Sequence, residues 1–393
     1  MKFEPAVLAI QDDLIAWRRH IHQHPELSFK EFKTTKFIEE KLTSFGYESI
    51  NRPTRTGLIA STSGSKPGSS RKIAIRADID ALPLQENNDL PFASINSEVM
   101  HACGHDGHTA ILLAVAKLLI ENPEWFCGEV RLIFQHAEEL PPGGAIELFD
   151  AGAVDGVESV LGLHLSSNFE TGIFGVKPDV LTAAVDRFEI TLAGKGGHCA
   201  YPEQSIDPVP AMAELILALQ TIVSRKIAPK DPAVVSVCMA HTGTAYNIIP
   251  DDSTITASVR TFSPEVRTQI EYEVRQIASG IALSHGLTAV VDYDNGYPSV
   301  FNDPALTQLA EHTLIKRFGN TQVLHIDSLM PGEDFSYFLR DCKGFFVELG
   351  SRNIAKGSDQ PHHNPKYRLD EDALLYGVQY FLDMVRELLN GVS

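Results

Sequence analysis

The sequence predicts an α/β fold in which a small α+β domain is inserted into a larger domain with a mainly parallel sheet covered by helices. Three observations support this prediction. Strand and helix patterns alternate from the N-terminus to about His164, a β-α-β-β-α-β order follows, and helix and strand patterns return after about Tyr297. The length of 393 residues also favours two domains, because one domain usually holds about 100–200 residues.

The first part of the chain alternates between the two kinds of pattern. Strand patterns lie at 71–78, 129–134 and 160–164, and helical patterns lie at 12–22, 30–45 and 109–120. The segment 109–120 (TAILLAVAKLLI) is apolar nearly all round, which predicts a buried helix. Strands that alternate with helices favour a mainly parallel sheet with helices on both faces.

The middle of the chain has a different order of elements. Strand patterns lie at 186–193, 234–240, 253–261 and 289–293, with helical patterns at 209–225 and from Ser263 onward. Ser263 is a good N-cap, and Pro264 suits the first turn of a helix. The β-α-β-β-α-β order is that of the split βαβ, ferredoxin-like unit. We therefore expect an inserted domain at 181–296 and a discontinuous larger domain at 1–180 and 297–393.

The composition is that of a soluble globular protein, with 44% hydrophobic and 21% charged residues. The net charge of −18 argues against nucleic acid and anionic membranes as partners, because both attract a positive face. We expect no secretory signal, since Asp12 and Asp13 interrupt the first apolar run, and no spanning helix, since no run of about 18 apolar residues occurs. The five widely spaced cysteines suggest reduced thiols and a cytoplasmic location.

The stretch M-H-A-C-G-H-D-G-H-T-A, residues 100–110, brings a cysteine, three histidines and an aspartate close together. It precedes the predicted buried helix, at the edge where open α/β sheets place their sites. Cys103 and His105 are two residues apart, and thiolate and imidazole both bind a borderline ion such as Zn²⁺. Cys103 could equally be a thiol nucleophile with a histidine base. The stretch alone leaves both hypotheses open.

Four further motifs carry polar side chains at strand ends or in loops. They are H-A-E-E at 136–139, His164, P-H-H-N-P at 361–365 and G-K-G-G-H at 194–198. Each one alone also has a purely structural explanation, such as a solvated helix start or a hydrogen-bonded loop histidine. The last motif is not a phosphate-binding loop, because the chain lacks the G-x-x-x-x-G-K-[ST] pattern. The dinucleotide-binding G-x-G-x-x-G pattern is absent as well.

The motifs of the larger domain can converge, because the sites of open α/β sheets gather at one edge. Together they offer a set of metal-binding side chains that is large enough for two divalent ions. The set comprises Cys103, His105, Glu139, His164 and His363. Glu138 adds a second carboxylate beside Glu139, so that one carboxylate can bind a metal while the other acts as a base.

With these motifs the chain resembles the M20 family of metallopeptidases, in particular its amidohydrolase branch. That branch includes hippurate hydrolases, N-acyl-amino-acid amidohydrolases and plant indole-acetyl-amino-acid hydrolases. The resemblance covers nearly the whole chain through R-R-H-I-H-Q-H-P-E-L-S-F (18–29), R-A-D-I-D-A-L-P (76–83), H-A-C-G-H-D-G-H (101–108), H-A-E-E (136–139), G-K-G-G-H (194–198), Y-N-I-I-P (246–250), P-G-E-D-F-S-Y-F (331–338) and H-N-P-K-Y (363–367). The C-G-H-D-G-H motif marks the branch, since other members use aspartate as the bridging ligand.

The resemblance implies two divalent ions bridged by Cys103. In such a site His105 and His164 would be the further ligands of one ion, and Glu139 and His363 would be those of the other. Glu138 would be the general base. Three aspartates would orient the histidines, namely Asp78, Asp80 and Asp106.

The resemblance also gives roles to residues of the inserted domain. His198 would enter the active site of the partner subunit in a dimer and stabilise the oxyanion. Asn247 and Arg260 would bind the carboxylate of the substrate. We therefore expect a homodimer, or an oligomer built from dimers, that assembles through the inserted domain.

The implied reaction is hydrolysis of the amide bond of an N-acyl amino acid, such as hippurate or an N-acetyl amino acid. The ions would be Zn²⁺ or Mn²⁺, with Co²⁺ or Ni²⁺ as alternatives. A dipeptidase or a glutamate-carboxypeptidase-like exopeptidase is the alternative function on the same scaffold. A second alternative is a cysteine hydrolase, whose activity would resist chelators and would be abolished by iodoacetamide. A non-catalytic metal-binding dimer would have no need of Glu138.

Overall fold

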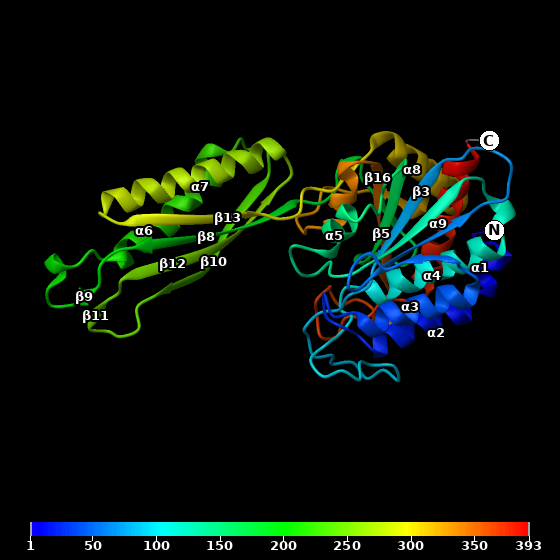
Figure 1. The fold of residues 1–393 in the computed structure, drawn as a ribbon, viewed down its shortest axis with the longest axis horizontal. Helices are drawn as coiled ribbons and strands as arrows, with labels where there is room; N and C mark the ends of the chain where they lie inside the picture. The colour runs from blue at the N-terminus through cyan, green and yellow to red at the C-terminus, as the bar shows by residue number, and fades with distance from the viewer. Residues whose placement is uncertain (1, 392–393) are drawn as a thin grey trace. The chain divides into compact units, whose positions relative to one another are not determined.

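The computed structural model describes residues 2–391, which form two compact units (Figure 1). Unit 1 holds the residues up to Leu181, Val300–Asp327 and those from Asp334 onward. Unit 2 holds Thr182–Ser299 and Ser328–Glu333. The chain thus leaves unit 1 one residue after the expected 180/181 boundary and returns three residues after the expected 296/297 boundary. The second visit to unit 2, at Ser328–Glu333, was not expected from the sequence.

Unit 1 is built on a large, mainly parallel sheet. Its strands are β1 (Ser49–Asn51), β2 (Leu58–Ser63), β3 (Lys72–Asp78), β4 (Glu129–Gln135), β5 (Ser159–Glu170), β6 (Phe174–Val176), β15 (Val323–His325) and β16 (Lys343–Arg352). They lie in the order β1-β2-β4-β3-β5-β16-β6-β15, and the central strands β4, β3, β5 and β16 are parallel. A short pair, β7 (Asp179–Val180) and β14 (Phe301–Asn302), accompanies it. The predicted α/β class is confirmed.

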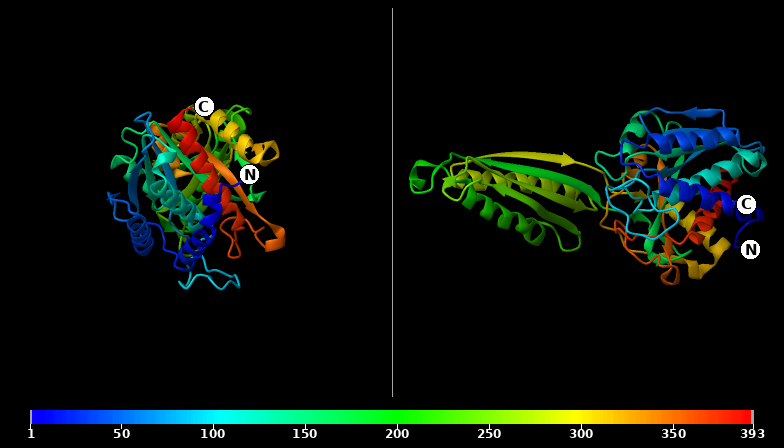
Figure 2. Two further views of the ribbon diagram at one scale, coloured as in Figure 1. Left: turned by 90° about the vertical axis from the view of Figure 1, so that its right-hand side faces the viewer. Right: turned by 90° about the horizontal axis from the view of Figure 1, so that it is seen from below.

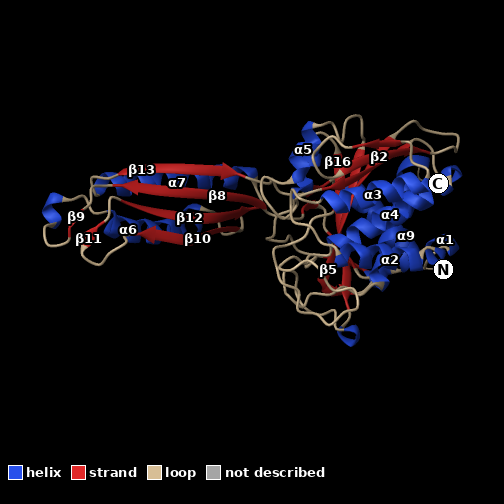
Figure 3. Cartoon of the chain, turned by 60° about the horizontal axis from the view of Figure 1, so that its bottom comes forward, coloured by secondary structure: helices blue, strands red, loops and turns tan. Residues whose placement is uncertain are grey.

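The helices of unit 1 pack on this sheet or, in the case of α1 and α2, on other helices of the unit. They are α1 (Pro5–Ala9), α2 (Gln11–Gln23), α3 (Phe32–Phe45), α4 (His105–Glu121), α5 (Gly144–Asp150), α8 (Pro304–Phe318) and α9 (Asp372–Asn390). Helix α4 contacts α2, α3 and α9, and these helices lie side by side (Figures 2 and 3). None of the helices in residues 2–391 is long and apolar enough to cross a membrane.

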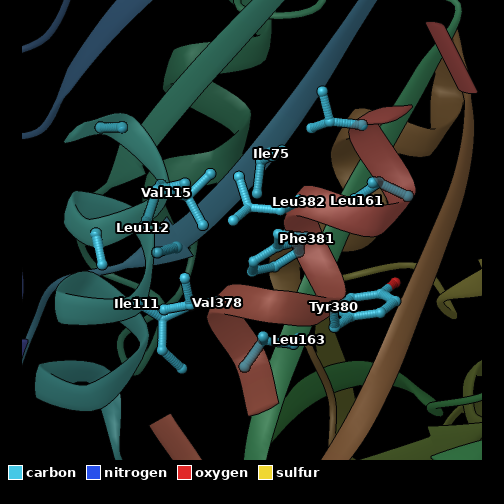
Figure 4. Packing of buried hydrophobic residues seen from close by; sticks show 14 of the residues in the cluster. Ile75, Ile111, Leu112, Val115, Leu161, Leu163, Val378, Tyr380, Phe381 and Leu382 are labelled. Carbon is cyan, nitrogen blue, oxygen red and sulfur yellow. The ribbon is translucent and has the colours of Figure 1, made fainter. Parts of the chain in front are cut away.

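The core of unit 1 lies between α4, α9 and the sheet. Leu112 of α4, Phe381 of α9 and Ile75 of β3 are almost completely buried in this layer (Figure 4). Every residue from 105 to 116 is buried, as predicted for the apolar segment at 109–120. Gly377 allows α9 to approach α4 closely, because a Cβ atom there would lie 2.6 Å from Ile111 Cδ1. This packing fixes the N-terminal end of α4, which carries His105.

Unit 2 has the predicted β-α-β-β-α-β order. The elements are β8 (Ala184–Ala193), α6 (Pro208–Thr221), β10 (Ala233–Thr242), β12 (Asp252–Thr261), α7 (Pro264–Ser284) and β13 (Thr288–Asn295). The strands are antiparallel in the order β10-β12-β8-β13, and both helices pack on one face of this small sheet (Figure 2). Ser263 caps α7 by accepting a hydrogen bond from the N–H of Val266. A short pair, β9 (Gly197–His198) and β11 (Ile248–Ile249), extends from one end.

Candidate metal centre

The register of the large sheet brings the polar strand ends of unit 1 to one level. Asp78, the last residue of β3, is paired with Gln135, the last residue of β4. Ile75 is paired with Leu161, so His164 of β5 lies at about the same level as Asp78. Because the carboxyl ends of parallel strands share one edge of the sheet, the residues that follow β3 and β4 meet His164 there.

The loop before α4 brings Cys103 and His105 to the same edge. Gly104 lies between them with φ +100°, a left-handed conformation that glycine adopts without steric cost. A Cβ atom at this position would also lie 3.0 Å from the Tyr367 hydroxyl oxygen. This turn starts α4 at His105 and leaves Cys103 just ahead of the helix.

The predicted ligand atoms lie close to one another. Cys103 Sγ is 3.4 Å from His164 Nε2. Glu139 Oε1 is 3.3 Å from His363 Nε2 and 3.9 Å from His105 Nε2. Ligands that share one tetrahedral ion at ordinary bond lengths stand about 3.3–3.8 Å apart. The spacing of these atoms therefore suits divalent metal ions.

Two groups of potential ligand atoms share the Cys103 thiol. One group is Cys103, His105 and Glu139, and the other is Cys103, His164 and His362. The shared thiol is where a bridging ligand would stand. Glu139 also lies beside His363, the residue that the resemblance pairs with it, while His105 groups with Glu139 and not with His164.

His362 was not predicted from the sequence as part of this site. Its Nε2 accepts a hydrogen bond from the N–H of Ser167 at 3.1 Å, and its ring lies against those of His164 and Tyr367. The next residue, His363, has φ +62°, a strained conformation for a residue other than glycine. The backbone at His363 is held by its N–H, which donates to the Ala102 carbonyl at 2.8 Å.

Buried atoms without partners show that the residues fit a metal ion. Among residues 2–391, neither His105 Nε2 nor Glu139 Oε1 has a partner with acceptable hydrogen-bond geometry, although both atoms are buried. A buried polar atom without a partner costs about 1–3 kcal/mol. A divalent cation between these atoms would satisfy both, and the mixture of thiol, imidazole and carboxylate suits Zn²⁺ or a similar ion.

Two of the three predicted aspartates orient histidines beside this centre. Asp80 accepts a hydrogen bond from His105 Nδ1 at 3.1 Å, which leaves Nε2 to face the centre. Asp78 is 2.6 Å from His108 Nδ1 and 2.7 Å from Arg76 Nη1. His108 Nε2 in turn accepts the N–H of Leu165 at 2.8 Å. His108 therefore links β3 to β5 next to the centre, a role that the sequence analysis missed.

Asp106 also contacts a histidine, but one that lies on α2. Its carboxylate binds Arg18 at 2.7 Å and His22 at 2.8 Å, and neither residue is a predicted ligand, as is also true of His108 beside Asp78. Consecutive residues of a helix point about 100° apart, so Asp106 cannot follow His105 towards the centre. It instead connects the start of α4 to α2, which carries Arg18 and His22.

The electrostatic surroundings favour a bound cation and oppose a thiol nucleophile. Burial and the charges of Glu139 and Glu138 raise the pKa of the Cys103 thiol well above its usual range. Burial and the neighbouring His108 lower the pKa of His164 well below its usual range. A nucleophilic cysteine needs a lowered thiol pKa and a base that can take its proton. The pair at 3.4 Å has the opposite properties, whereas a neutral imidazole is ready to bind a metal.

The carboxylates around His105 also favour a bound cation. Burial opposes a charge on His105, but Asp78 and Asp80 outweigh it and raise the pKa of His105 to about 10. The imidazole thus attracts a proton when no other cation is present. Negative charge is concentrated at this edge of the sheet, where a divalent ion would neutralise it.

The predicted residues of unit 2 lie at two ends of the small sheet. His198 is paired with Ile248, next to Asn247, and both His198 and Asn247 are exposed. Arg260 is paired with Val185 at the other end of β8 and β12. Asp252, which begins β12, is eight residues from Arg260, or roughly 27 Å along the strand. The structure therefore brings His198 and Asn247 together and separates both of them from Arg260.

The connections to unit 1 lie at the end of the small sheet that carries Arg260. Unit 2 begins at Thr182, three residues before Val185, and β13 ends at Asn295, shortly before the return at Val300. Arg260 Nη1 is buried and has no hydrogen-bond partner within residues 2–391. An unpaired guanidinium nitrogen of this kind suits a carboxylate ligand.

The chain is similar to known proteins over most of its length. The profile of peptidase family M20/M25/M40 matches residues 74–387. An N-acyl-L-amino acid amidohydrolase of Geobacillus stearothermophilus is 48% identical over 293 residues, covering 75% of this chain and 79% of the relative. An N-acetylcysteine deacetylase of Bacillus subtilis is 42% identical over 386 residues, covering 98% and 99%. A Bacillus subtilis structure described as a dinuclear metal binding peptidase of the M20 family superposes with a TM-score of 0.84 at 38% identity, covering 98% of this chain and 100% of that one. The chain therefore belongs to peptidase family M20/M25/M40.

Proposed function

We propose that this protein is a metal-dependent hydrolase that cleaves the amide bond of N-acyl amino acids, giving a carboxylic acid and a free amino acid. The observation that carries the proposal is the Cys103 thiol shared by two groups of ligand atoms, with Glu138 directly beside the ligand Glu139. The names of the relatives, an N-acyl-L-amino acid amidohydrolase and an N-acetylcysteine deacetylase, support this class of substrate.

We assign the metal ligands to five side chains and the shared position to Cys103. The ligands are Cys103, His105, Glu139, His164 and His363. Two bound divalent ions, Zn²⁺ or Mn²⁺ with Co²⁺ or Ni²⁺ as alternatives, would acidify water and polarise the amide carbonyl. Asp80 holds His105 in the tautomer that leaves Nε2 free for a metal.

Glu138 is the proposed general base. It lies close enough for its charge to raise the pKa of the Cys103 thiol. Its carboxylate would accept the proton of the attacking water and pass it to the amide nitrogen as the C–N bond breaks. An amine leaves as an anion unless it is protonated, so delivery of this proton is what makes the bond cleavable.

Residues of unit 2 would complete the substrate site. Arg260 is half-buried and offers its buried, unpaired Nη1 for the α-carboxylate of the amino acid, and Asn247 is a second candidate for this contact. His198 would stabilise the oxyanion that forms on the amide carbonyl. Because His198 and Arg260 lie at opposite ends of the small sheet, one copy of unit 2 cannot bring both to a single amino acid.

This separation supports a homodimer. In such a dimer His198 and Asn247 would serve the centre of the partner subunit, and assembly would go through unit 2. The five free cysteines, all within the described residues, are consistent with the cytoplasmic location that we also propose.

Substrate and metal assays test the function directly. The metal content of the purified protein is measured by mass spectrometry, and the release of free amino acid is measured from hippurate, N-acetyl amino acids and dipeptides. We expect about two divalent ions per chain and activity on N-acyl amino acids that phenanthroline removes. Added Zn²⁺ or Mn²⁺ should restore this activity.

Two outcomes would overturn the proposed function, and a third would overturn the role of Glu138. Faster hydrolysis of dipeptides than of every N-acyl amino acid would make the protein an exopeptidase. Full activity in the presence of the chelator, together with loss of activity after iodoacetamide, would favour the cysteine hydrolase. A Glu138→Gln variant that binds both ions and turns over at the wild-type rate would remove Glu138 from the mechanism.

A further inference from the structure

The backbone on both sides of Glu138 is held by buried carboxylates from other parts of unit 1. The N–H of Ala137 donates to Glu31 Oε1 at 2.8 Å, and the N–H of Glu139 donates to Asp80 Oδ2 at 3.0 Å. Asp80 also orients His105, but Glu31 has no contact with a predicted ligand side chain among the hydrogen bonds of residues 2–391. Its contact with Ala137 therefore needs an explanation of its own.

Ala137 has a conformation that its surroundings must hold. Its φ is +49°, in the left-handed region, which costs a residue with a Cβ atom about 1 kcal/mol or more. Its carbonyl accepts the N–H of Gly144 at 3.0 Å, while its own N–H donates to Glu31. Both polar backbone groups of Ala137 are thus fixed, and this turn sets the direction in which the following residue, Glu138, leaves the end of β4.

Glu31 is itself rigidly placed. Its side chain is completely buried, and the same Oε1 also accepts the N–H of Phe29 at 2.9 Å. Its carbonyl accepts the N–H and the hydroxyl of Thr35 in the first turn of α3. A buried carboxylate without a cationic partner is costly, and one Glu31 oxygen has no hydrogen-bond partner within residues 2–391. Residues kept at such a cost often have a functional role.

We propose that Glu31 is a positioning residue for the general base, because it holds the left-handed turn at Ala137 that aims the Glu138 carboxylate. This inference rests on the proposed role of Glu138. It assigns to Glu31 an effect on the rate of the chemical step and not on metal binding. A small displacement of a catalytic group can cost about 100-fold in rate.

Two substitutions distinguish the effect of the length of the Glu31 side chain from the effect of its negative charge. Glu31→Gln keeps an acceptor oxygen at the same distance and removes the charge, whereas Glu31→Asp keeps the charge and shortens the side chain. Glu26→Asp is the matched control, because Glu26 accepts the N–H groups of Lys33 and Thr34 at 2.8 Å in the same segment and has no hydrogen bond to Ala137 within residues 2–391. Each variant is assayed as metal-loaded protein for kcat, KM and metal content.

A second measurement does not depend on activity. Hydrogen–deuterium exchange of the peptide covering 135–144 reports whether the N–H of Ala137 is still held. We expect Glu31→Asp to lower kcat at least about 10-fold, with KM within about threefold and full metal content, and to speed exchange in this peptide. Glu31→Gln should keep kcat within about threefold and the wild-type exchange rate, and Glu26→Asp should leave both unchanged.

The proposal is overturned if Glu31→Asp keeps wild-type kcat and exchange, or if Glu31→Gln is as impaired as Glu31→Asp. Glu138→Gln is assayed in parallel. If the wild type hydrolyses no N-acyl amino acid, or if Glu138→Gln keeps its turnover, the proposed function fails, and the exchange rates still decide whether Glu31 holds the turn.

Discussion

His198 and Arg260 lie at opposite ends of the small sheet of unit 2. His198 is paired with Ile248 in the short β9–β11 pair, whereas Arg260 is paired with Val185 near the point where unit 2 begins. Roughly 27 Å of β12 separates the two ends. A substrate as small as an N-acyl amino acid cannot span this distance, so the two residues can act on one substrate only if they come from two copies of the chain.

A mixed dimer tests this arrangement. His198→Ala and Glu138→Gln are each expected to abolish most activity as pure proteins. When the two variants are co-expressed with different tags and the mixed dimer is isolated, one of its two centres should have both intact residues. We therefore expect the mixed dimer to recover about half of the wild-type kcat per dimer. If His198 serves the centre of its own chain, the mixed dimer stays as inactive as its parents.

Loss of the shared thiol should affect metal binding before anything else. Cys103→Ser replaces a soft thiolate, the residue common to both ligand groups, by a weakly binding hydroxyl. We expect the affinity for Zn²⁺ to fall at least about 100-fold. The free energy of unfolding of the metal-free variant should stay within about 1 kcal/mol of that of the metal-free wild type. Competition with a chromophoric chelator measures the affinity. Cys342→Ser is the control, because Cys342 is also partly buried and its thiol donates to the Phe338 carbonyl. Equal Zn²⁺ affinity of both variants would contradict the bridging role.

Much of the fold and of the centre could be predicted from local patterns. The largely apolar segment at 109–120 forms most of the buried α4, and the strand patterns before Asp78 and Glu138 form neighbouring parallel strands. Asp80 and Glu139 come shortly after the ends of these strands. Because the ends of parallel strands share one edge of a sheet, the topology alone predicts that these side chains lie close together. His108 could also have been found, since residues three apart on a helix share a face and His105 was already assigned there.

The remaining features depend on contacts that leave no periodic signal. Glu31 reaches a backbone N–H that is 106 residues away, and no side-chain pattern encodes a backbone partner. Asp106 follows His105 directly in sequence but points towards α2, because the helix turns about 100° per residue. The second visit of the chain to unit 2, at Ser328–Glu333, likewise follows from tertiary packing.

Arg260 should determine the preference for a free carboxylate. Removal of a charged hydrogen bond costs about 1.5–3 kcal/mol, so Arg260→Ala is expected to raise KM for an N-acyl amino acid about 10- to 100-fold with a smaller effect on kcat. The same substitution should leave KM for the corresponding N-acyl amino acid amide nearly unchanged. Steady-state kinetics on the two substrates measures the difference. Arg187→Ala, an exposed arginine of the same sheet paired with Glu189, is the control. An equal loss on both substrates would argue for a structural role of Arg260.

Glu31 should make the stability of unit 1 depend on pH. Burial and the charge of Asp80 raise the pKa of Glu31 to about 7 in the folded protein, from an ordinary value of 4.5. Between these two values the folded state binds a proton that the unfolded state has lost, so this contribution to stability is present below about pH 4.5 and is lost as pH rises to about 7. The shift corresponds to at most about 3 kcal/mol.

Glu31→Gln stays neutral and should remove this dependence. In metal-free protein we expect the variant to match the wild type near pH 4 and to be more stable by up to about 3 kcal/mol near pH 8. Urea unfolding followed by tryptophan fluorescence measures this, because Trp17 and Trp125 both belong to unit 1. Glu26→Gln should show no such gain with rising pH. A Glu31→Gln variant that is less stable than the wild type at pH 8 would show that the ionised carboxylate supports the fold, contrary to its unpaired burial. The same variant keeps the contact to Ala137, so a gain in stability together with an unchanged kcat would place the role of Glu31 in its acceptor oxygen and not in its charge.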